Sequence, residues 1–232
     1  MKLVSAEGSQ QQQYALSNTY ARNVAHILAE HIEDAPDLLP VISEILQKYT
    51  GHKHENVTNK LNSIGSLYEK ESDGEAPDYI INLLSALENV YQCSAEQIDR
   101  LRGAIVELLG RELICPRYRT SGECANSRRF VNSRNEEVTI QEVDVAAISY
   151  LHSQLEGYEC KIKSASVMHD DCVDLAYLAK KSEEESYQAH VGIISLDPDK
   201  MIARRLNRLD TEQCIQVYGI ESIKELKYSP FD

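Results

Sequence analysis

The stretch Glu137–Ser164 reads EVTIQEVDVAAISYLHSQLEGYECKIKS, and it decides how the second half of the chain folds. Apolar and β-branched residues alternate with polar ones at both of its ends, and the polar segment LHSQLEG separates them. This pattern is typical of two strands that are joined by a turn. We therefore expect a β-hairpin between Thr139 and Ser164.

The charged residues of this hairpin recur at positions that share a face. Residues two apart in a strand point the same way, so Glu159 and Lys161 share a face of the second strand. Glu142 and Asp144 share a face of the first strand in the same way. If the register places Asp144 opposite Glu159, two carboxylates converge, which is costly unless a divalent cation lies between them.

The spacing of these residues resembles a known catalytic signature. The aspartate of E-V-D lies fifteen residues before the glutamate of E-C-K. This pattern resembles the D…(D/E)-x-K signature of the restriction-endonuclease-like PD-(D/E)xK superfamily, which includes restriction enzymes and Mrr-like nucleases. The predicted order of elements across residues 95–220 is also similar, with a helix before the hairpin, then a helix, a strand, a helix and a strand.

The resemblance implies a Mg²⁺-dependent DNA endonuclease of a restriction or phage-defence type. It implies that Asp144 and Glu159 ligate Mg²⁺, with Mn²⁺ as a substitute, and that the backbone carbonyl of Cys160 joins them. It also implies that Lys161 orients or deprotonates the attacking water. The chemistry suits these residue types, because Mg²⁺ prefers oxygen ligands and lowers the pKa of a bound water.

The family also carries a glutamate on the helix before the hairpin, in a G-x-x-x-E-like setting. The segment Gly103-Ala-Ile-Val-Glu107 matches this setting, so the resemblance adds Glu107 to the catalytic residues. On a helical wheel, however, Glu107 lies away from the apolar stripe and Glu112 lies near it. Either glutamate, or neither, approaches the metal.

One segment is basic although the chain carries a formal net charge of −13, which argues against a protein that coats nucleic acid nonspecifically. The segment runs from Cys115 to Arg134 and contains a single glutamate. Arginines bind phosphate through paired donors, so these are the predicted DNA contacts. They are Arg117, Arg119, Arg128, Arg129 and Arg134. An ordinary solvated loop is the alternative interpretation.

The six cysteines are scattered and form no C-x-x-C pair. No segment is long and apolar enough for a membrane span or a signal peptide. We therefore expect a cytoplasmic protein that has no membrane contact and no disulfide bonds. Cys115 and Cys124 resemble the start of a zinc finger, but no further ligand follows at the required spacing, so we reject zinc.

The first part of the chain predicts a helical bundle. Apolar residues recur at helical spacing in several stretches between Gln10 and Gln92. A further helix begins at Ser94, where Ser94 and Gln97 form a predicted capping box. We place a domain boundary there, with a bundle over 1–93 for self-association or a protein partner, and an α/β (α+β) nuclease domain over 94–232, whose mixed sheet is flanked by helices.

Two other interpretations belong to different functional classes. Cys172 and His190 are similar to the cysteine and histidine segments of NlpC/P60-type peptidases, but too few residues separate them for the strands of that fold. The runner-up is a catalytically silent member of the nuclease fold that acts as a protein-interaction module. Its hairpin charges would then be salt-bridged cross-strand pairs, and metal titration discriminates between the two.

Overall fold

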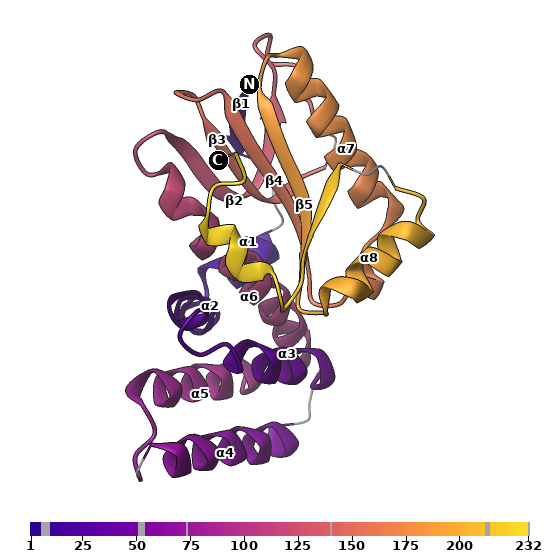
Figure 1. The fold of residues 1–232 in the computed structure, drawn as a ribbon. Helices are drawn as coiled ribbons and strands as arrows, with labels where there is room; N and C mark the ends of the chain where they lie inside the picture. The colour runs from indigo at the N-terminus through magenta and orange to yellow at the C-terminus, as the bar shows by residue number, and fades with distance from the viewer. Residues whose placement is uncertain (6–9, 51–53, 73, 140, 212–213, 232) are drawn as a thin grey trace.

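A computed structural model describes residues 1–232 except 6–9, 51–53, 73, 140, 212–213 and 232. The protein is of the mixed α/β class, as the sequence predicts. One six-stranded sheet is flanked by helices, and most of the N-terminal part is helical (Figure 1). None of the described helices is both long and apolar enough to cross a bilayer.

The sheet has the strand order β1-β2-β3-β4-β5-β6, and neighbouring strands are hydrogen-bonded. Strands β1 to β4 pair in antiparallel fashion, whereas β4, β5 and β6 are parallel to one another. The predicted hairpin is β3–β4, and its turn is shorter than LHSQLEG because β4 already begins at Gln154. The strands are β1 (Lys2–Ser5), β2 (Gly122–Val131), β3 (Val143–Ser149), β4 (Gln154–Lys161), β5 (Gln188–Ser195) and β6 (Ile215–Tyr218).

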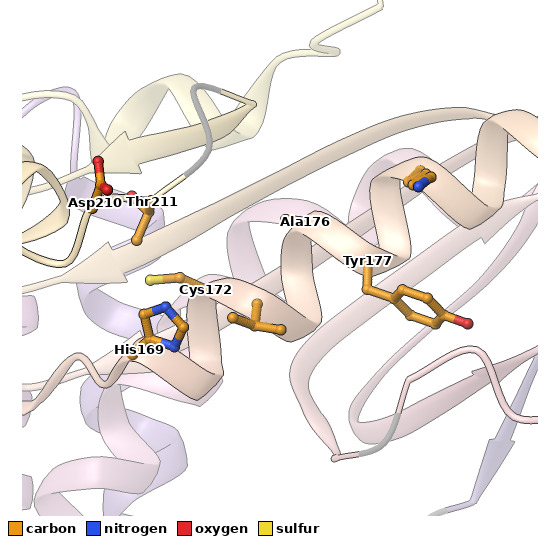
Figure 2. A pocket seen from close by; sticks show the side chains of 8 residues that line it. His169, Cys172, Ala176, Tyr177, Asp210 and Thr211 are labelled. Carbon is orange, nitrogen blue, oxygen red and sulfur yellow. The ribbon is translucent and has the colours of Figure 1, made fainter.

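Two sets of helices cover the two faces of this sheet. Helix α6 (Ala95–Ile114) packs on one face, and its N-terminus carries the capping box of Ser94 and Gln97 that the sequence predicts. Helices α7 (His169–Glu184) and α8 (Asp199–Arg208) cover the other face. A groove of about 310 Å³ runs along α7, and Figure 2 shows its lining, which includes Cys172 and Tyr177.

The predicted N-terminal helices are present. Their amphipathic stripes bury leucine, isoleucine and valine, as the helical spacing requires. The sequence did not predict β1, which precedes them and pairs with β2 at the edge of the sheet. The helices are α1 (Gln10–Ser17), α2 (Thr19–His31), α3 (Leu38–Lys48), α4 (His54–Glu71) and α5 (Asp78–Tyr91).

The N-terminal helices and the sheet share one hydrophobic core. It extends from α2, α3 and α5 through α6 to the near face of the sheet. A buried polar contact reinforces this junction, because Gln47 of α3 donates to Asp197, which lies just after β5, at 2.9 Å. The domain boundary at residues 93 and 94 stays a prediction, although β1 lies in the sheet and not in the bundle.

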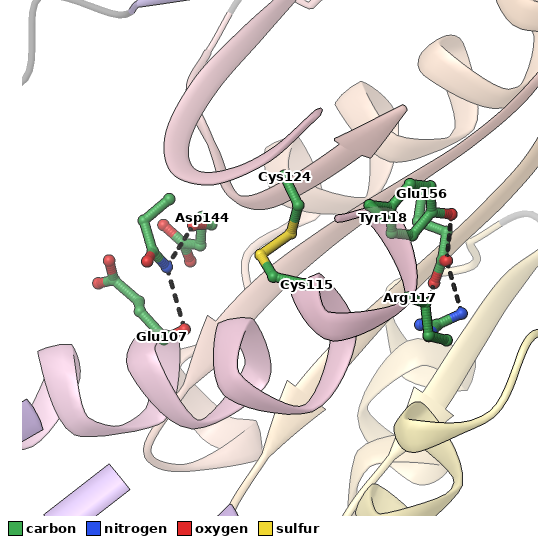
Figure 3. The surroundings of a disulfide bond; sticks show 8 residues. Glu107, Cys115, Arg117, Tyr118, Cys124, Asp144 and Glu156 are labelled. Atoms are coloured by element: carbon green, nitrogen blue, oxygen red, sulfur yellow. Dashed lines mark hydrogen bonds and ion pairs between the residues drawn. A yellow bond between two sulfur atoms is a disulfide. The ribbon is translucent and has the colours of Figure 1, made fainter. Parts of the chain in front are cut away.

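The expectation that the protein contains no disulfide is wrong. Cys115 and Cys124 form one, with their Cα atoms 5.2 Å apart (Figure 3). The bond joins the short 3₁₀ helix η1 (Cys115–Tyr118), which follows α6, to the start of β2. The two cysteines are nine residues apart in the sequence, and the chain reverses direction between them. No spacing motif signals this pairing, because it depends on how η1 meets the sheet.

Candidate active site

The predicted catalytic residues of the hairpin lie together on the face of the sheet that α7 covers. Val145 pairs with Tyr158, so the next step of the antiparallel ladder places Asp144 opposite Glu159. The backbone N–H of Cys160 donates to Asp144 Oδ2 at 2.7 Å, which joins the two strands at this point. The register that the metal-site hypothesis requires is therefore present.

Close packing beneath α7 holds these strands in place. Ile148 of β3 and Leu155 of β4 are fully buried on the same face as the charged residues. Gly157 lies between them and the site, and a Cβ atom there would approach Leu178 of α7 to 2.7 Å. The glycine thus allows α7 to lie close to the strand that carries Glu159 and Lys161.

Lys161 lies at the centre of the carboxylates. Its Nζ atom is 2.9 Å from Glu159, 3.3 Å from Asp171 and 4.0 Å from Asp144. Asp171 is not among the catalytic residues that the sequence predicts. It comes from the first turn of α7 and also accepts a hydrogen bond from the backbone N–H of Met168. In the sequence, such a residue is typical of a helix cap. Only the packing of α7 on β4 brings it to the lysine.

Glu107 is the glutamate of α6 that approaches this cluster. The negative charge of Asp144 acts on it, and the side chain of Gln12 in α1 hydrogen-bonds to it. Figure 3 shows Glu107 and Asp144 on the same side of the disulfide. The amide of Asn126 donates to the backbone carbonyls of both residues. Glu112, the other possibility from the sequence, points elsewhere and lies 3.4 Å from His26.

The surroundings of the carboxylates favour their neutral forms. Burial, reinforced by the charge of Asp144, raises the pKa of Glu107 to about 8. Burial also raises the pKa of Asp144, although Lys161 opposes this shift, and burial together with Asp144 raises the pKa of Glu159. Burial lowers the pKa of Lys161, but Glu159 and Asp144 outweigh it, so its pKa rises and it stays protonated.

Several oxygen atoms around Asp144 lack a hydrogen-bond donor. Glu107 Oε2, Glu142 Oε2 and Asn126 Oδ1 are buried acceptors with no partner among the described residues. A buried acceptor without a partner costs roughly 1–3 kcal/mol. Three acidic side chains, Asp144, Glu159 and Asp171, lie within 4.0 Å of the single lysine, and Glu107 is close enough to feel the charge of Asp144, so negative charge is in excess whenever these groups are ionised. Additional positive charge would stabilise this arrangement.

The residues that could hold a divalent cation are Asp144, Glu159 and the carbonyl of Cys160, as the resemblance implies. Two carboxylates with one carbonyl suit Mg²⁺, which keeps several of its waters. Over the described ranges, however, no group of three or more His, Cys, Asp or Glu side chains is arranged to hold a metal ion. The donor set fits Mg²⁺ chemically, and Lys161 competes with a cation for the same oxygens.

The structure separates the five arginines that were predicted to bind DNA. Arg117 is paired with Glu156 at 2.8 Å, and Arg129 with Glu137 at 2.9 Å. Arg119 and Arg134 are exposed. Only Arg128, on β2, lines a pocket that adjoins the carboxylates. Spacing in the sequence does not reveal these different fates, because they depend on which residues from other elements each arginine meets.

The peptidase alternative fails on geometry. Cys172 packs in the core beneath α7, whereas His190 lies on the opposite face of the sheet and bonds to the hydroxyl of Tyr218 at 2.7 Å. Burial, together with the charge of Asp171, raises the pKa of the Cys172 thiol to about 11, so it is a poor nucleophile. Cys172 and His190 therefore do not form the pair that the alternative requires.

A second buried carboxylate, Glu156, lies on the face of β4 opposite to Glu159. It accepts two hydrogen bonds from Arg117, at 2.8 and 3.0 Å. The hydroxyls of Tyr118 and Tyr158 also donate to it, the latter at 2.5 Å. Figure 3 shows Arg117, Tyr118 and Glu156 on the side of the disulfide away from Asp144. We call Glu156, Arg117, Tyr118 and Tyr158 the Glu156 network.

Comparisons with known proteins give no family. No protein-family model matches the chain, and no curated protein matches it. Among solved structures, it is similar to the crystal structure of protein VC1899 from Vibrio cholerae, at 17% identity and a TM-score of 0.44. The match covers 97% of this chain and 57% of the Vibrio chain. So distant a likeness carries no argument about function.

Proposed function

We propose that the protein is a Mg²⁺-dependent nuclease that hydrolyses phosphodiester bonds of DNA at the Asp144–Glu159–Lys161 site. The observation that carries the proposal is the convergence of three acidic side chains on one lysine at the end of a β-hairpin, with a fourth carboxyl, Glu107, close to Asp144. Perturbed titratable groups that cluster in this way are typical of functional sites. The order of α6, β2, β3, β4, α7 and β5 also agrees with the order that the resemblance implies.

When bound, a divalent cation would lower the pKa of a water molecule and offset charge on the phosphoryl oxygens. Asp144, Glu159 and the Cys160 carbonyl would hold it. Lys161, which is protonated, donates hydrogen bonds and suits orientation of the attacking water or stabilisation of the phosphoryl charge, not proton removal. Glu107 has a pKa near neutrality and suits acceptance of the proton from that water.

A second candidate function is a catalytically silent protein-interaction module, and one observation favours it. Lys161 already contacts three carboxylates and offsets part of their charge. The cluster would then be a buried ion network that stabilises the junction of β4 and α7. A chain with a net charge of −13 would suit a basic protein partner better than DNA.

The deciding experiment measures metal binding and cleavage separately. Mn²⁺ is titrated into the protein and followed by electron paramagnetic resonance, and plasmid DNA is incubated with Mg²⁺ or with excess chelator. We expect Mn²⁺ binding and plasmid nicking, both lost in Asp144→Asn. The matched control is Glu123→Gln, which removes an exposed carboxylate from β2. Nicking that persists in chelator contradicts the mechanism, and absence of Mn²⁺ binding supports the silent module.

The proposal extends to the N-terminal helices, which we infer to mediate self-association. Leu67 of α4 and Ile81 of α5 are both about half exposed, at 52% and 53%. Apolar side chains on a helical surface are typical of an interface between proteins. Light scattering on the full chain tests this point, with Leu67→Asp and Ile81→Asp as variants that should favour the monomer. A monomeric wild-type protein contradicts it.

A further inference from the structure

Three arginines from three distant parts of the sequence converge on one pocket. Arg22 comes from α2, Arg111 from α6 and Arg128 from β2, and the pocket between them has a volume of about 480 Å³. This volume is within the range of sites that hold small ligands. No acidic residue of the described chain lines the pocket, although acidic residues outnumber basic ones by 37 to 24 overall.

Across the described part of the chain, no ion pair neutralises these arginines. Arg128 hydrogen-bonds to the hydroxyl of Ser5 at 3.2 Å, and none of the three is within ion-pair distance of a carboxylate among the described residues. Arg117 and Arg129, by contrast, are each paired with a glutamate. Guanidinium groups that converge without carboxylates repel one another, and an anion such as phosphate would stabilise them.

The pocket adjoins the candidate active site. Asn126 lines it and donates to the backbone carbonyls of Glu107 and Asp144, both at 3.0 Å. Gln12 also lines it and hydrogen-bonds to the Glu107 side chain. Arg111 lies one helical turn after Glu107 on α6. A phosphate in the pocket is therefore only one side chain away from the carboxylates.

The backbone at the rim of the pocket is strained. Ser127 has a φ of 51°, which is unusual for a residue other than glycine, and the register of β2 and β3 places it opposite Asp144. Gln12 donates to its hydroxyl at 3.2 Å. Strain of this kind persists where the surrounding structure maintains it, and it is concentrated at functional sites.

From these observations we propose that the Arg22–Arg111–Arg128 pocket binds the phosphodiester backbone of a nucleic acid strand beside the phosphate that is cleaved. This inference rests on the proposed nuclease function and names the surface that holds its substrate. It assigns α1 and α2 to substrate binding in addition to any role in self-association. Arginine suits this role because its planar donors bind phosphate oxygens in pairs.

Binding is tested without catalysis, by fluorescence anisotropy of a labelled single-stranded DNA oligonucleotide in chelator. We expect the double variant Arg22→Ala, Arg111→Ala to bind at least about tenfold more weakly. The magnitude of its slope of log K against log salt should fall by about 1.4, which corresponds to two lost phosphate contacts on a single strand. The conservative variant Arg22→Lys, Arg111→Lys should retain most of the salt slope, because the charge is kept.

The matched control removes two exposed arginines of α8, in Arg204→Ala with Arg208→Ala. Unchanged affinity in the Arg22, Arg111 variant, or an equal loss in the α8 variant, overturns the inference. Mn²⁺ binding is measured on the same samples and reports on the carboxylates. If DNA binding depends on the arginines but Mn²⁺ does not bind, the inference survives while the proposed metal-dependent cleavage fails.

Discussion

Glu156 and Glu159 lie three residues apart on β4 and have opposite surroundings. Glu156 is fully buried and receives four hydrogen bonds, two of them from Arg117. Glu159 is 8% exposed and shares Lys161 with Asp144 and Asp171. Because alternate residues of a strand face opposite ways, the two glutamates contribute to separate networks on the two faces of the sheet.

The two networks differ in how far their buried charges and hydrogen-bonding atoms are balanced by partners. Arg117 balances the single charge of Glu156, and hydroxyl donors complete its hydrogen bonds. Around Lys161, by contrast, acidic groups outnumber the one cation, and buried oxygens such as Glu107 Oε2 lack donors. A compensated network stabilises the fold. A network with unbalanced charge keeps the capacity to bind an additional cation. For this reason we propose a function for the cluster around Lys161 and not for the Glu156 network.

The largest effect is expected when a carboxylate is removed from the cluster around Lys161. Asp144→Asn or Glu159→Gln should lower the rate of DNA cleavage by about 10³-fold or more, because the metal supplies several kcal/mol of stabilisation to the transition state. Initial rates of plasmid nicking measure this effect. Circular dichroism should show an intact fold in both variants. Cleavage within tenfold of the wild type in either variant contradicts the assignment.

The next effect is expected in the Glu156 network and concerns stability. Arg117→Ala leaves Glu156 buried without its cation, and should lower the free energy of unfolding by about 3–5 kcal/mol. Urea denaturation measures this change. The control is Arg129→Ala, whose partner Glu137 is exposed, and it should cost less than about 1 kcal/mol. Equal losses in the two variants would show that the buried ion pair of the Glu156 network stabilises the fold no more than an exposed ion pair does.

The disulfide between the two networks should have a smaller effect. Its nine-residue separation corresponds to about 2–3 kcal/mol of stabilisation through the entropy of the unfolded chain. The double variant Cys115→Ser, Cys124→Ser should therefore unfold at lower urea concentration while it keeps Mn²⁺ binding at Asp144. Cys93→Ser serves as the control. If a reducing agent leaves the urea midpoint of the wild type unchanged, the bond does not form in solution.

The last effect is a dependence of stability on pH and metal. The pKa of Glu107 rises from an ordinary 4.5 to about 8 in the folded protein. A raised pKa stabilises the fold below pH 4.5, and this contribution is lost as the pH rises through 8. In chelator, the Tm should therefore fall between pH 5 and pH 9.

Added Mg²⁺ should oppose this loss. At a concentration ten times its Kd, Mg²⁺ stabilises by roughly 1.4 kcal/mol, or a few degrees of Tm. The increase should be larger at pH 9 than at pH 5, because protons compete with the metal for the carboxylates. Differential scanning fluorimetry measures both trends, with Asp144→Asn as the control. A Tm increase in Mg²⁺ that does not depend on pH would place the ion elsewhere.

The sequence by itself determined the local features of the protein. The N-terminal helices follow from apolar residues at helical spacing, and the start of α6 follows from Ser94 and Gln97. The hairpin that carries Asp144 and Glu159 follows from alternation around a polar turn. These features depend on residues two to four positions apart, so a pattern in the sequence is enough to predict them.

Only the tertiary structure decided which distant residues join the site. Asp171 approaches Lys161 because α7 packs against the sheet, and Gln12 approaches Glu107 because α1 packs against α6. Neighbouring arginines separated for the same reason, since Arg128 faces the pocket of α1 and α2 while Arg129 pairs with Glu137. Such contacts depend on the direction in which each element crosses the next, and the local pattern of side chains does not encode that direction.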